Sequence, residues 1–314
     1  MAHRGMSLRR VPLLTVLALL ALTAPATSAR AAAHLSGPQL HQGLAKLATQ
    51  LGAEPVRAPS SRVSVTTFDA LMVQQLGAAD VAEAVRHEAW RAGLNPPATF
   101  GTEAVARLLG LRENLPYSQD ARELYPTDAI TLAAARHSFA VAAKWRGTAA
   151  EWARQQFSTF VLPDYDAAQK RVLRLAVAKV GMPYVWGGET DGAGAFFGGQ
   201  AHGGYDCSGL VWRVFKLSGL PWGARIRGRT AASQAGEIPK AQRIRLDDVR
   251  GGDLVFFGAA RFWMRATERR IVHEGIALSP DWMVHSSAQG VYVSPLRLDP
   301  WRAKRFSWAR RVLP

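Results

Sequence analysis

The stretch Tyr205-Asp206-Cys207-Ser208-Gly209-Leu210-Val211 indicates the beginning of a helix. The apolar residues from Leu210 onward recur at helical spacing as far as Phe215, and Asp206 is a residue type that caps helix N-termini. Cys207, the one cysteine of the chain, therefore falls in the first turn. Unpaired backbone N–H groups and the positive end of the helix dipole stabilise a thiolate there. The charge of Asp206 opposes this effect, so a reactive thiol still needs a base.

Two of the eight histidines are placed to act as that base and its partner. His273 lies in a predicted strand, Ile271–Leu278, and His285 lies in the next, Trp282–Ser286. A turn at Ser279-Pro280-Asp281 joins them, so in an antiparallel hairpin the imidazoles fall opposite each other or one pair apart. Cross-strand neighbours lie about 5 Å apart, close enough for one ring to orient the other. The pattern predicts a nucleophile, a base and an orienting group, as in cysteine hydrolases.

Five motifs follow one another in a specific order over about residues 165–314. They are Pro183–Gly188, Asp206–Gly209, Gly252–Phe257, His273–Leu278 and Val284–Ser286. In this order the chain resembles the NlpC/P60 peptidases, which are papain-like cysteine endopeptidases of the bacterial cell wall. The resemblance implies an α+β fold in which N-terminal helices of the domain pack on an antiparallel sheet.

The same resemblance implies roles for individual residues. Cys207 is the expected nucleophile, His273 the base that activates it, and His285 the polar residue that orients His273. Tyr184 is expected beside the nucleophile, where its hydroxyl supports an oxyanion together with the backbone N–H of Cys207. The residues expected to line the substrate groove are Asp206 and Ser208.

The reaction implied by the resemblance is hydrolysis of the amide between D-γ-glutamate and a diamino acid, diaminopimelate or lysine, in peptidoglycan stem peptides. It proceeds through a thioester and requires no metal or organic cofactor. Two alternatives stay open: an N-acetylmuramoyl-L-alanine amidase, because related Cys-His domains cut that bond, and a non-catalytic cell-wall-binding module. The presence of Cys207, His273 and His285 favours an active enzyme.

Three features near these motifs need separate interpretation. Glu274 replaces the usual small or apolar residue after the first histidine, and strand alternation puts it opposite His273, where it must be exposed or paired. An insertion, Glu189–Asp206, is predicted to form a wall or lid of the groove, and His202 within it is a weaker candidate base. Arg229 is predicted to lie either in the groove or in a solvated loop.

Residues 32–164 form a predicted helical domain that precedes the catalytic domain, 165–314. Helical spacing predicts helices at Pro38–Leu51, Phe68–Leu76, Ala79–Ala92, Thr102–Leu109, Asp128–Trp145 and Thr148–Phe160, the last opened by a capping box. The stretch Ala104–Phe139 loosely resembles a surface-layer-homology-type wall-binding repeat, with a plain packing, spacer or regulatory domain as the alternative.

Beyond residue 165 one more helix, Ala167–Val180, precedes a set of strands. The strands are predicted at Asp253–Phe257, Ile271–Leu278, Trp282–Ser286, Val291–Val293 and Phe306–Leu313. A helix first and then a run of strands is typical of an α+β domain.

The first 31 residues indicate an export signal. Arg9 and Arg10 precede an apolar run, Val11–Leu22, and Ala29-Arg30-Ala31 resembles a cleavage site. An uncleaved N-terminal anchor is the alternative, although the run is short for a membrane span. We therefore expect a secreted or wall-associated protein with no integral membrane span after signal removal.

Charge and cysteine content restrict the partners and cofactors. The formal net charge is +15, and residues 1–31 contain four arginines and no acid, which leaves +11 for the rest. This charge favours anionic cell-wall polymers, whereas export argues against a nucleic-acid partner. A single cysteine excludes an internal disulfide framework and a multi-cysteine zinc site, and a metal held by the two hairpin histidines lacks a third soft ligand apart from Cys207.

Overall fold

The computed structural model describes residues 33–192 and 203–314. The predicted export signal, residues 1–31, and the central part of the predicted insertion with His202 lie outside the described residues. Within the described ranges, no helix combines the length and apolar character that a membrane span requires.

The first half of the described chain is helical, as the sequence predicts. Its elements are α1 (Gly37–Leu51), α2 (Val65–Gln75), α3 (Ala79–Arg91), α4 (Phe100–Leu108), the 3-10 helix η1 (Tyr117–Arg122), α5 (Leu132–Lys144) and α6 (Ala149–Phe157). Ser36 and Ser64 cap α1 and α2 by accepting hydrogen bonds from backbone N–H groups.

Three predicted helix starts differ from the structure by two residues or more: α2 begins at Val65 rather than Phe68, α4 at Phe100 rather than Thr102, and α5 at Leu132 rather than Asp128. Helix α5 begins at Leu132, with Thr131 as its N-cap, because the residues before it extend and pair with the chain ahead of α2: Ile130 N–H donates to the Val63 carbonyl. The capping box predicted at Thr148 does not form. The Thr148 hydroxyl donates to the carbonyl of Trp145 at 2.6 Å instead.

The second half combines helices with two sheets. Its helices are α7 (Ala167–Val177), α8 (Cys207–Trp212), η2 (Arg213–Leu217), η3 (Pro221–Arg225), α9 (Ala231–Gly236), η4 (Lys240–Gln242), η5 (Leu246–Asp248) and α10 (Pro300–Arg305). Its strands are β1 (Glu189–Thr190), β2 (Gly204–Tyr205), β3 (Leu254–Gly258), β4 (Ile271–Ala277), β5 (Trp282–Ser287), β6 (Gly290–Pro295) and β7 (Phe306–Arg310). The α+β fold class predicted from the sequence is confirmed.

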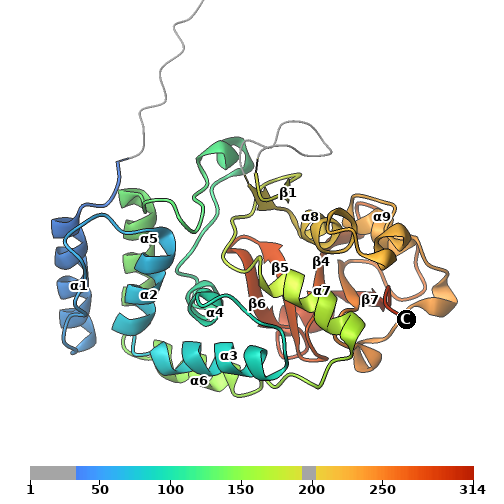
Figure 1. Cartoon of the computed structure of the whole chain (residues 1–314), viewed down its shortest axis with the longest axis horizontal. Helices are drawn as coiled ribbons and strands as arrows, with labels where there is room; N and C mark the ends of the chain where they lie inside the picture. The colour runs from blue at the N-terminus through green and yellow to red at the C-terminus, as the bar shows by residue number, and fades with distance from the viewer. Residues whose placement is uncertain (1–32, 193–202) are drawn as a thin grey trace, which may run out of the picture. The chain divides into compact units, whose positions relative to one another are not determined.

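The five-stranded sheet has the order β6-β5-β4-β3-β7, and all its pairs are antiparallel. Helices α8 and α9 pack against β4, so they cover one face of the sheet at its centre (Figure 1). The short strands β1 and β2 pair with each other at the two ends of the predicted insertion. This pairing brings the beginning of the insertion, at Glu189, beside Tyr205 and so close to the start of α8.

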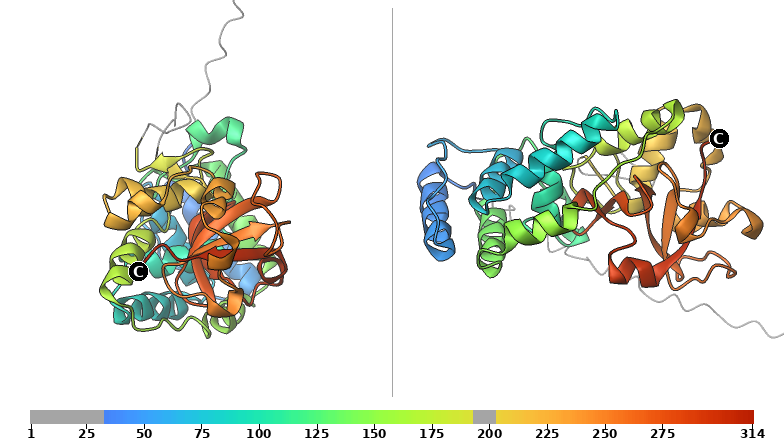
Figure 2. Two further views of the ribbon diagram at one scale, coloured as in Figure 1. Left: turned by 90° about the vertical axis from the view of Figure 1, so that its right-hand side faces the viewer. Right: turned by 90° about the horizontal axis from the view of Figure 1, so that it is seen from below.

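The helical half and the sheet share one hydrophobic cluster. Trp282 of β5 is fully buried; its ring stacks on Phe157 with centroids 5.0 Å apart and meets Phe160 edge-on at 5.1 Å. Its indole N–H donates to the carbonyl of Thr159 at 3.0 Å. Figure 2 shows the helices of the first half (blue to green) gathered beside the sheet (orange to red). The domain boundary near residue 165 stays a prediction.

We expect Trp282→Ala to lower the free energy of unfolding by about 3–5 kcal/mol, the usual cost of emptying a buried tryptophan site. Because the ring joins the helical half to the sheet, both halves should lose stability in one shared transition. Urea denaturation followed by circular dichroism measures this. Trp263→Ala, at a tryptophan that is 67% exposed, is the control and should change stability little. Two separate transitions, with only one of them shifted, would contradict the expectation.

Candidate active site

Cys207 occupies the first position of α8, as the sequence predicts. The carboxylate of Asp206 accepts a hydrogen bond from the backbone N–H of Gly209 at 2.5 Å and so caps the helix. The thiol is half-buried. The N-cap therefore fixes the position of Cys207 at the N-terminus of α8.

The surroundings of the thiol favour its neutral form. Burial raises the pKa of Cys207, and the nearby carboxyl groups of Asp206 and Glu274 raise it further. The backbone N–H groups of Glu274 and Ser208 act in the opposite direction by hydrogen bonding to the sulfur. The contact with Glu274 also places Cys207 against strand β4, beside the residue that follows His273.

The two hairpin histidines contact each other directly. Strands β4 and β5 pair Ile276 with Val284. Continuing this register places His285 opposite Gly275, two residues from His273, so both histidines lie on the same face of the sheet. Their ring nitrogens, His273 Nε2 and His285 Nδ1, lie 2.8 Å apart. The chain of contacts continues from His285 Nε2 to the hydroxyl of Ser294 on β6, also at 2.8 Å.

Both imidazoles are held neutral. Burial lowers the pKa of His273 to about 3 and that of His285 well below its usual range, and the positive charge of Arg302 adds to both shifts. Arg302 Nη2 lies 3.3 Å from His285 Nε2. A neutral imidazole has one nitrogen lone pair that can accept a proton, which is the state that a general base requires.

Arg302 and Ser294 were not singled out from the sequence. Ser294 is an ordinary strand residue, and its position beside His285 depends on the β5–β6 pairing. Arg302 belongs to a basic segment flanked by aromatic residues, and the sequence does not indicate which arginine of this segment contacts His285.

Arg229 is buried, with 4% of its surface exposed, so the prediction of a solvated loop is wrong. Its guanidinium donates to the carboxylates of Glu189 at 2.6 Å and Asp206 at 3.0 Å, and to the hydroxyl of Ser208 at 2.9 Å. It also donates to the carbonyls of Gly187 and Gly188. A planar cation with five N–H donors suits such a set of acceptors. Arg229 thus ties the chain before the insertion to the start of α8.

The same contacts bury Asp206 and Ser208, which are 9% and 5% exposed. The Ser208 hydroxyl donates to Asp206 at 3.0 Å. Their polar groups are therefore engaged within the protein, and their role in substrate binding stays a prediction.

Tyr184 is positioned by a residue of the helical half. The side-chain amide of Asn114 donates to the Tyr184 carbonyl at 2.6 Å and accepts from its backbone N–H at 3.4 Å. Burial raises the pKa of the Tyr184 hydroxyl, with a further contribution from Cys207, so the phenol stays protonated and able to donate. No sequence signal pointed to Asn114.

Glu274 contradicts its prediction of being exposed or paired. It is fully buried, and neither carboxyl oxygen has a hydrogen-bond partner in the described part of the chain. Strand alternation does put it opposite His273, but that face lies under α8 and α9 rather than in solvent. Burial raises the pKa of Glu274 well above its usual range, with Asp206 adding to the shift, so the side chain is a neutral acid.

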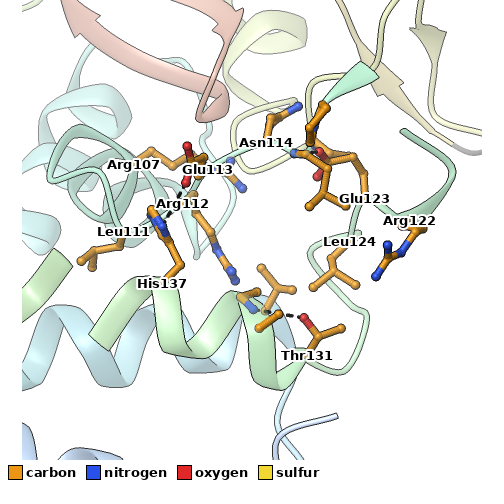
Figure 3. Close-up of a pocket in the computed structure, with 16 residues that line it drawn as sticks. Arg107, Leu111, Arg112, Glu113, Asn114, Arg122, Glu123, Leu124, Thr131 and His137 are labelled. Atoms are coloured by element: carbon orange, nitrogen blue, oxygen red, sulfur yellow. Dashed lines mark hydrogen bonds and ion pairs between the residues drawn. The ribbon is translucent and has the colours of Figure 1, made fainter. Parts of the chain in front are cut away.

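A cavity of about 530 Å³ lies in the helical half. Figure 3 shows Asn114 and Glu123 across it from Thr131 at the start of α5. It meets the Tyr184 segment through Asn114 and Pro183, but none of the predicted catalytic residues lines it. In the described ranges, no cluster of three histidine, cysteine or acidic side chains could hold a metal ion.

Comparison with known proteins tests the family resemblance. Residues 181–310 match the model of the NlpC/P60 family. The chain carries an NlpC/P60 domain. This confirms the resemblance stated from the five motifs, and the domain contains Cys207, His273 and His285.

The chain spans between 29% and 46% of the length of three curated relatives that it matches. A probable endopeptidase of Mycobacterium tuberculosis is 33% identical over 45% of this chain and 29% of its own length. The bifunctional muramidase/DL-endopeptidase CwlT of Bacillus subtilis is 32% identical over 44% of this chain and 35% of its own. The murein DD-endopeptidase MepH of Escherichia coli is 28% identical over 46% of each chain.

Solved structures also align with part of the chain. The P60 domain of antigen MAP1204 from M. avium subspecies paratuberculosis is 27% identical, covers 47% of this chain and 96% of that domain, and has a TM-score of 0.34.

We expect Arg229→Met to destabilise the protein by about 3–5 kcal/mol, because it leaves buried Asp206 without its cation. Arg229→Lys should recover only part of the loss, since a point charge cannot reach all five acceptors. Urea denaturation gives the free energies. Arg227→Met, at an exposed arginine two residues away, should change little. Equal stability of wild type and Arg229→Met would contradict the assigned role.

The raised pKa of Glu274 predicts a specific pH dependence of stability. The folded state holds this proton more tightly than the unfolded state, so stability is fully present below about pH 4, the unfolded pKa of a glutamate, and falls as pH rises toward the folded pKa. Glu274→Gln removes this loss. Relative to wild type, the variant should gain stability with rising pH, by up to about 1.4 kcal/mol per unit.

The measurement is urea denaturation of both proteins at pH 4 and pH 8. Glu54→Gln, the same change at an exposed glutamate, is the control for the substitution itself. A constant difference between Glu274→Gln and wild type at both pH values would show that the carboxyl does not titrate abnormally.

Proposed function

We propose that this chain is a peptidoglycan hydrolase, a cysteine endopeptidase that cuts the D-γ-glutamyl–diamino acid bond of stem peptides. The observation that carries the proposal is the hydrogen-bonded pair His273–His285, together with a cysteine at a helix N-terminus whose sulfur accepts from the backbone N–H of Glu274, the residue after His273, within residues that match the NlpC/P60 family. Endopeptidase is also the named activity of the relatives in the mycobacterial, Bacillus and Escherichia examples.

In the proposed mechanism the first step forms a thioester. Neutral His273 takes the proton of the Cys207 thiol as the sulfur attacks the γ-carbonyl carbon. The backbone N–H of Cys207 and the hydroxyl of Tyr184 stabilise the resulting oxyanion. The intermediate then collapses: the C–N bond breaks, protonated His273 gives its proton to the leaving amine, and a thioester to Cys207 remains.

Water completes the cycle. His273, neutral again, takes a proton from the water that attacks the thioester carbonyl, and the thiol is restored as the γ-carboxylic acid leaves. This role requires that His273 Nε2–H donates to His285 Nδ1, and that His285 Nε2–H donates to the Ser294 hydroxyl. His285 then fixes the tautomer in which the other nitrogen of His273 faces the nucleophile.

The proposal extends to location and domain organisation. Export by residues 1–31, action in the cell wall and attraction to anionic wall polymers are consistent with a net charge of +11 outside that segment. We assign residues 165–314 as the catalytic domain and residues 32–164 as a helical packing or spacer domain, because Asn114 and Trp282 connect the two through direct contacts.

The test is mass spectrometry of defined muropeptides after incubation with the full chain, beside a Cys207→Ala control. We expect new fragments split between D-glutamate and the diamino acid, and a loss of at least a thousandfold in rate in the control, since removal of a nucleophile costs about that much or more. His285→Ala should retain some activity because it orients rather than reacts.

The products also separate the alternatives. Intact stem peptides freed from the sugar would make the protein an amidase. Cross-linked dimers converted to monomers would make it a DD-endopeptidase, the activity named for MepH. Binding to sacculi without any cleavage would leave a cell-wall-binding module.

A further inference from the structure

The cavity in the helical half has the features of a ligand-binding site. Its volume of about 530 Å³ lies within the range of about 300–1,000 Å³ that is usual for small-molecule sites. Apolar side chains of Leu111, Leu115 and Leu124 form part of its lining. Since none of the predicted catalytic residues lines it, a ligand in this cavity is separate from the bond that the proposed reaction cuts.

Arg112 supplies hydrogen-bond donors at the wall of this cavity. Its side chain is 10% exposed, and its Nε–H donates to the carboxylate of Asp69 at 2.9 Å. Its Nη2 is buried and has no hydrogen-bond partner among the described residues. A guanidinium carries five N–H donors, and a buried donor without an acceptor is costly. The two oxygens of a carboxylate match such a planar set of donors.

Glu123 lies across the cavity from Arg112 (Figure 3). One of its carboxyl oxygens accepts a hydrogen bond from the backbone N–H of Leu115, and the carboxyl group forms no ion pair with any residue that the structure describes. Burial raises the pKa of Glu123 to about 7. A positive charge brought beside this group, such as the ammonium of a ligand, stabilises the carboxylate.

The mouth of the cavity also carries both signs of charge. Glu113 and Arg122 line the cavity and are exposed to solvent, so a ligand can enter beside them. Arg122 Nη1 donates to the neutral side chain of Gln119 at 2.9 Å, which leaves its charge uncompensated. A ligand with charge of one sign alone meets repulsion from one of these groups, whereas a ligand with both signs has a partner for each end.

We propose that this cavity binds a small zwitterionic peptide. Its carboxylate lies at the guanidinium of Arg112, its ammonium at the carboxylate of Glu123, and its small apolar side chains pack on the leucines of the wall. Burying the apolar part supplies affinity, and the two charged ends fix the direction in which the peptide lies. The inference does not rest on the proposed function, because it concerns binding alone.

The cavity borders the segment that holds Tyr184. Arg112 and Leu115 lie on either side of Asn114, whose side-chain amide donates to the Tyr184 carbonyl at 2.6 Å. The backbone N–H of Asn114 donates to the carbonyl of Ala288 at 2.7 Å. A peptide held between Arg112 and Glu123 therefore stabilises the chain on both sides of Asn114 in the conformation that contacts Tyr184.

The test is calorimetry of the full chain with trialanine, with its N-acetylated form, which lacks the ammonium, and with its C-terminal amide, which lacks the carboxylate. We expect trialanine to bind, and each blocked peptide to bind at least about tenfold more weakly, because one charged end has lost its partner.

Two conservative variants locate the binding site. Glu123→Gln keeps an oxygen that accepts from Leu115 but removes the negative charge, and Arg112→Lys keeps a positive charge beside Asp69 but removes the planar donors. We expect each to weaken trialanine binding about tenfold. Circular dichroism checks that each variant is folded. Arg136→Met, at an exposed arginine of α5 outside the lining, is the control and should leave the affinity unchanged.

Three results would overturn the inference. The first is no detectable binding of trialanine at about 10 mM peptide, well above the range of a specific site. The second is equal affinity for the free and the blocked peptides, which would show that the charged ends are not recognised. The third is unchanged affinity of folded Glu123→Gln and Arg112→Lys, which would place the peptide elsewhere on the protein. Because turnover is not measured, a chain that cuts a different bond would refute the proposed function and leave this inference standing.

Discussion

The buried guanidinium of Arg229 is the interaction on which the candidate site depends. It binds the carbonyls of Gly187 and Gly188, the carboxylates of Glu189 and Asp206 and the hydroxyl of Ser208. These acceptors belong to two segments, residues 187–189 and 206–208, so one side chain holds the start of the insertion beside the predicted nucleophile, Cys207. The arrangement also balances charge. Asp206 caps α8, and a bare carboxylate beside Cys207 would oppose the thiolate; Arg229 compensates that charge from the buried side.

The helical half takes part in the site through a few polar contacts. Arg107 donates to the carbonyls of Gly181 and Gln289, Asn114 brackets the backbone of Tyr184, and Asp120 accepts from Trp186. These residues come from a single stretch, 107–120, that begins in the last turn of α4. The wall of the site that carries Tyr184 is therefore supported from outside the NlpC/P60 domain. This favours a packing role for residues 32–164 over a loosely tethered module.

Features that depend on local sequence were predictable, and features that depend on tertiary packing were not. The N-cap at Asp206 and the spacing of His273 and His285 depend on a helix start and a short hairpin, and both could be inferred from neighbouring residues. Glu274 shows the limit of prediction from sequence. Strand alternation correctly predicts that it lies on the face opposite His273, but only the packing of α8 and α9 excludes water from that face. The contacts of Asn114 with Tyr184 and of Ser294 with His285 join residues for which no sequence pattern predicts proximity. Arg229 was assigned to two environments because a single arginine motif does not say which acceptors surround it.

The site keeps its reacting groups neutral until a substrate arrives. Burial raises the pKa of Cys207 and lowers that of His273, so the thiol and the imidazole both resist charge in the free protein. An ion pair of thiolate and imidazolium is therefore unfavourable here unless negative charge moves onward at once to the carbonyl oxygen. In the proposed mechanism, proton transfer and attack are then coupled: the sulfur loses its proton as it forms the new bond, and the oxyanion receives the charge beside Tyr184. Glu274 is also kept neutral, because its burial raises its pKa. An ionised carboxylate under α8 would repel the negative charge that develops on the sulfur of Cys207.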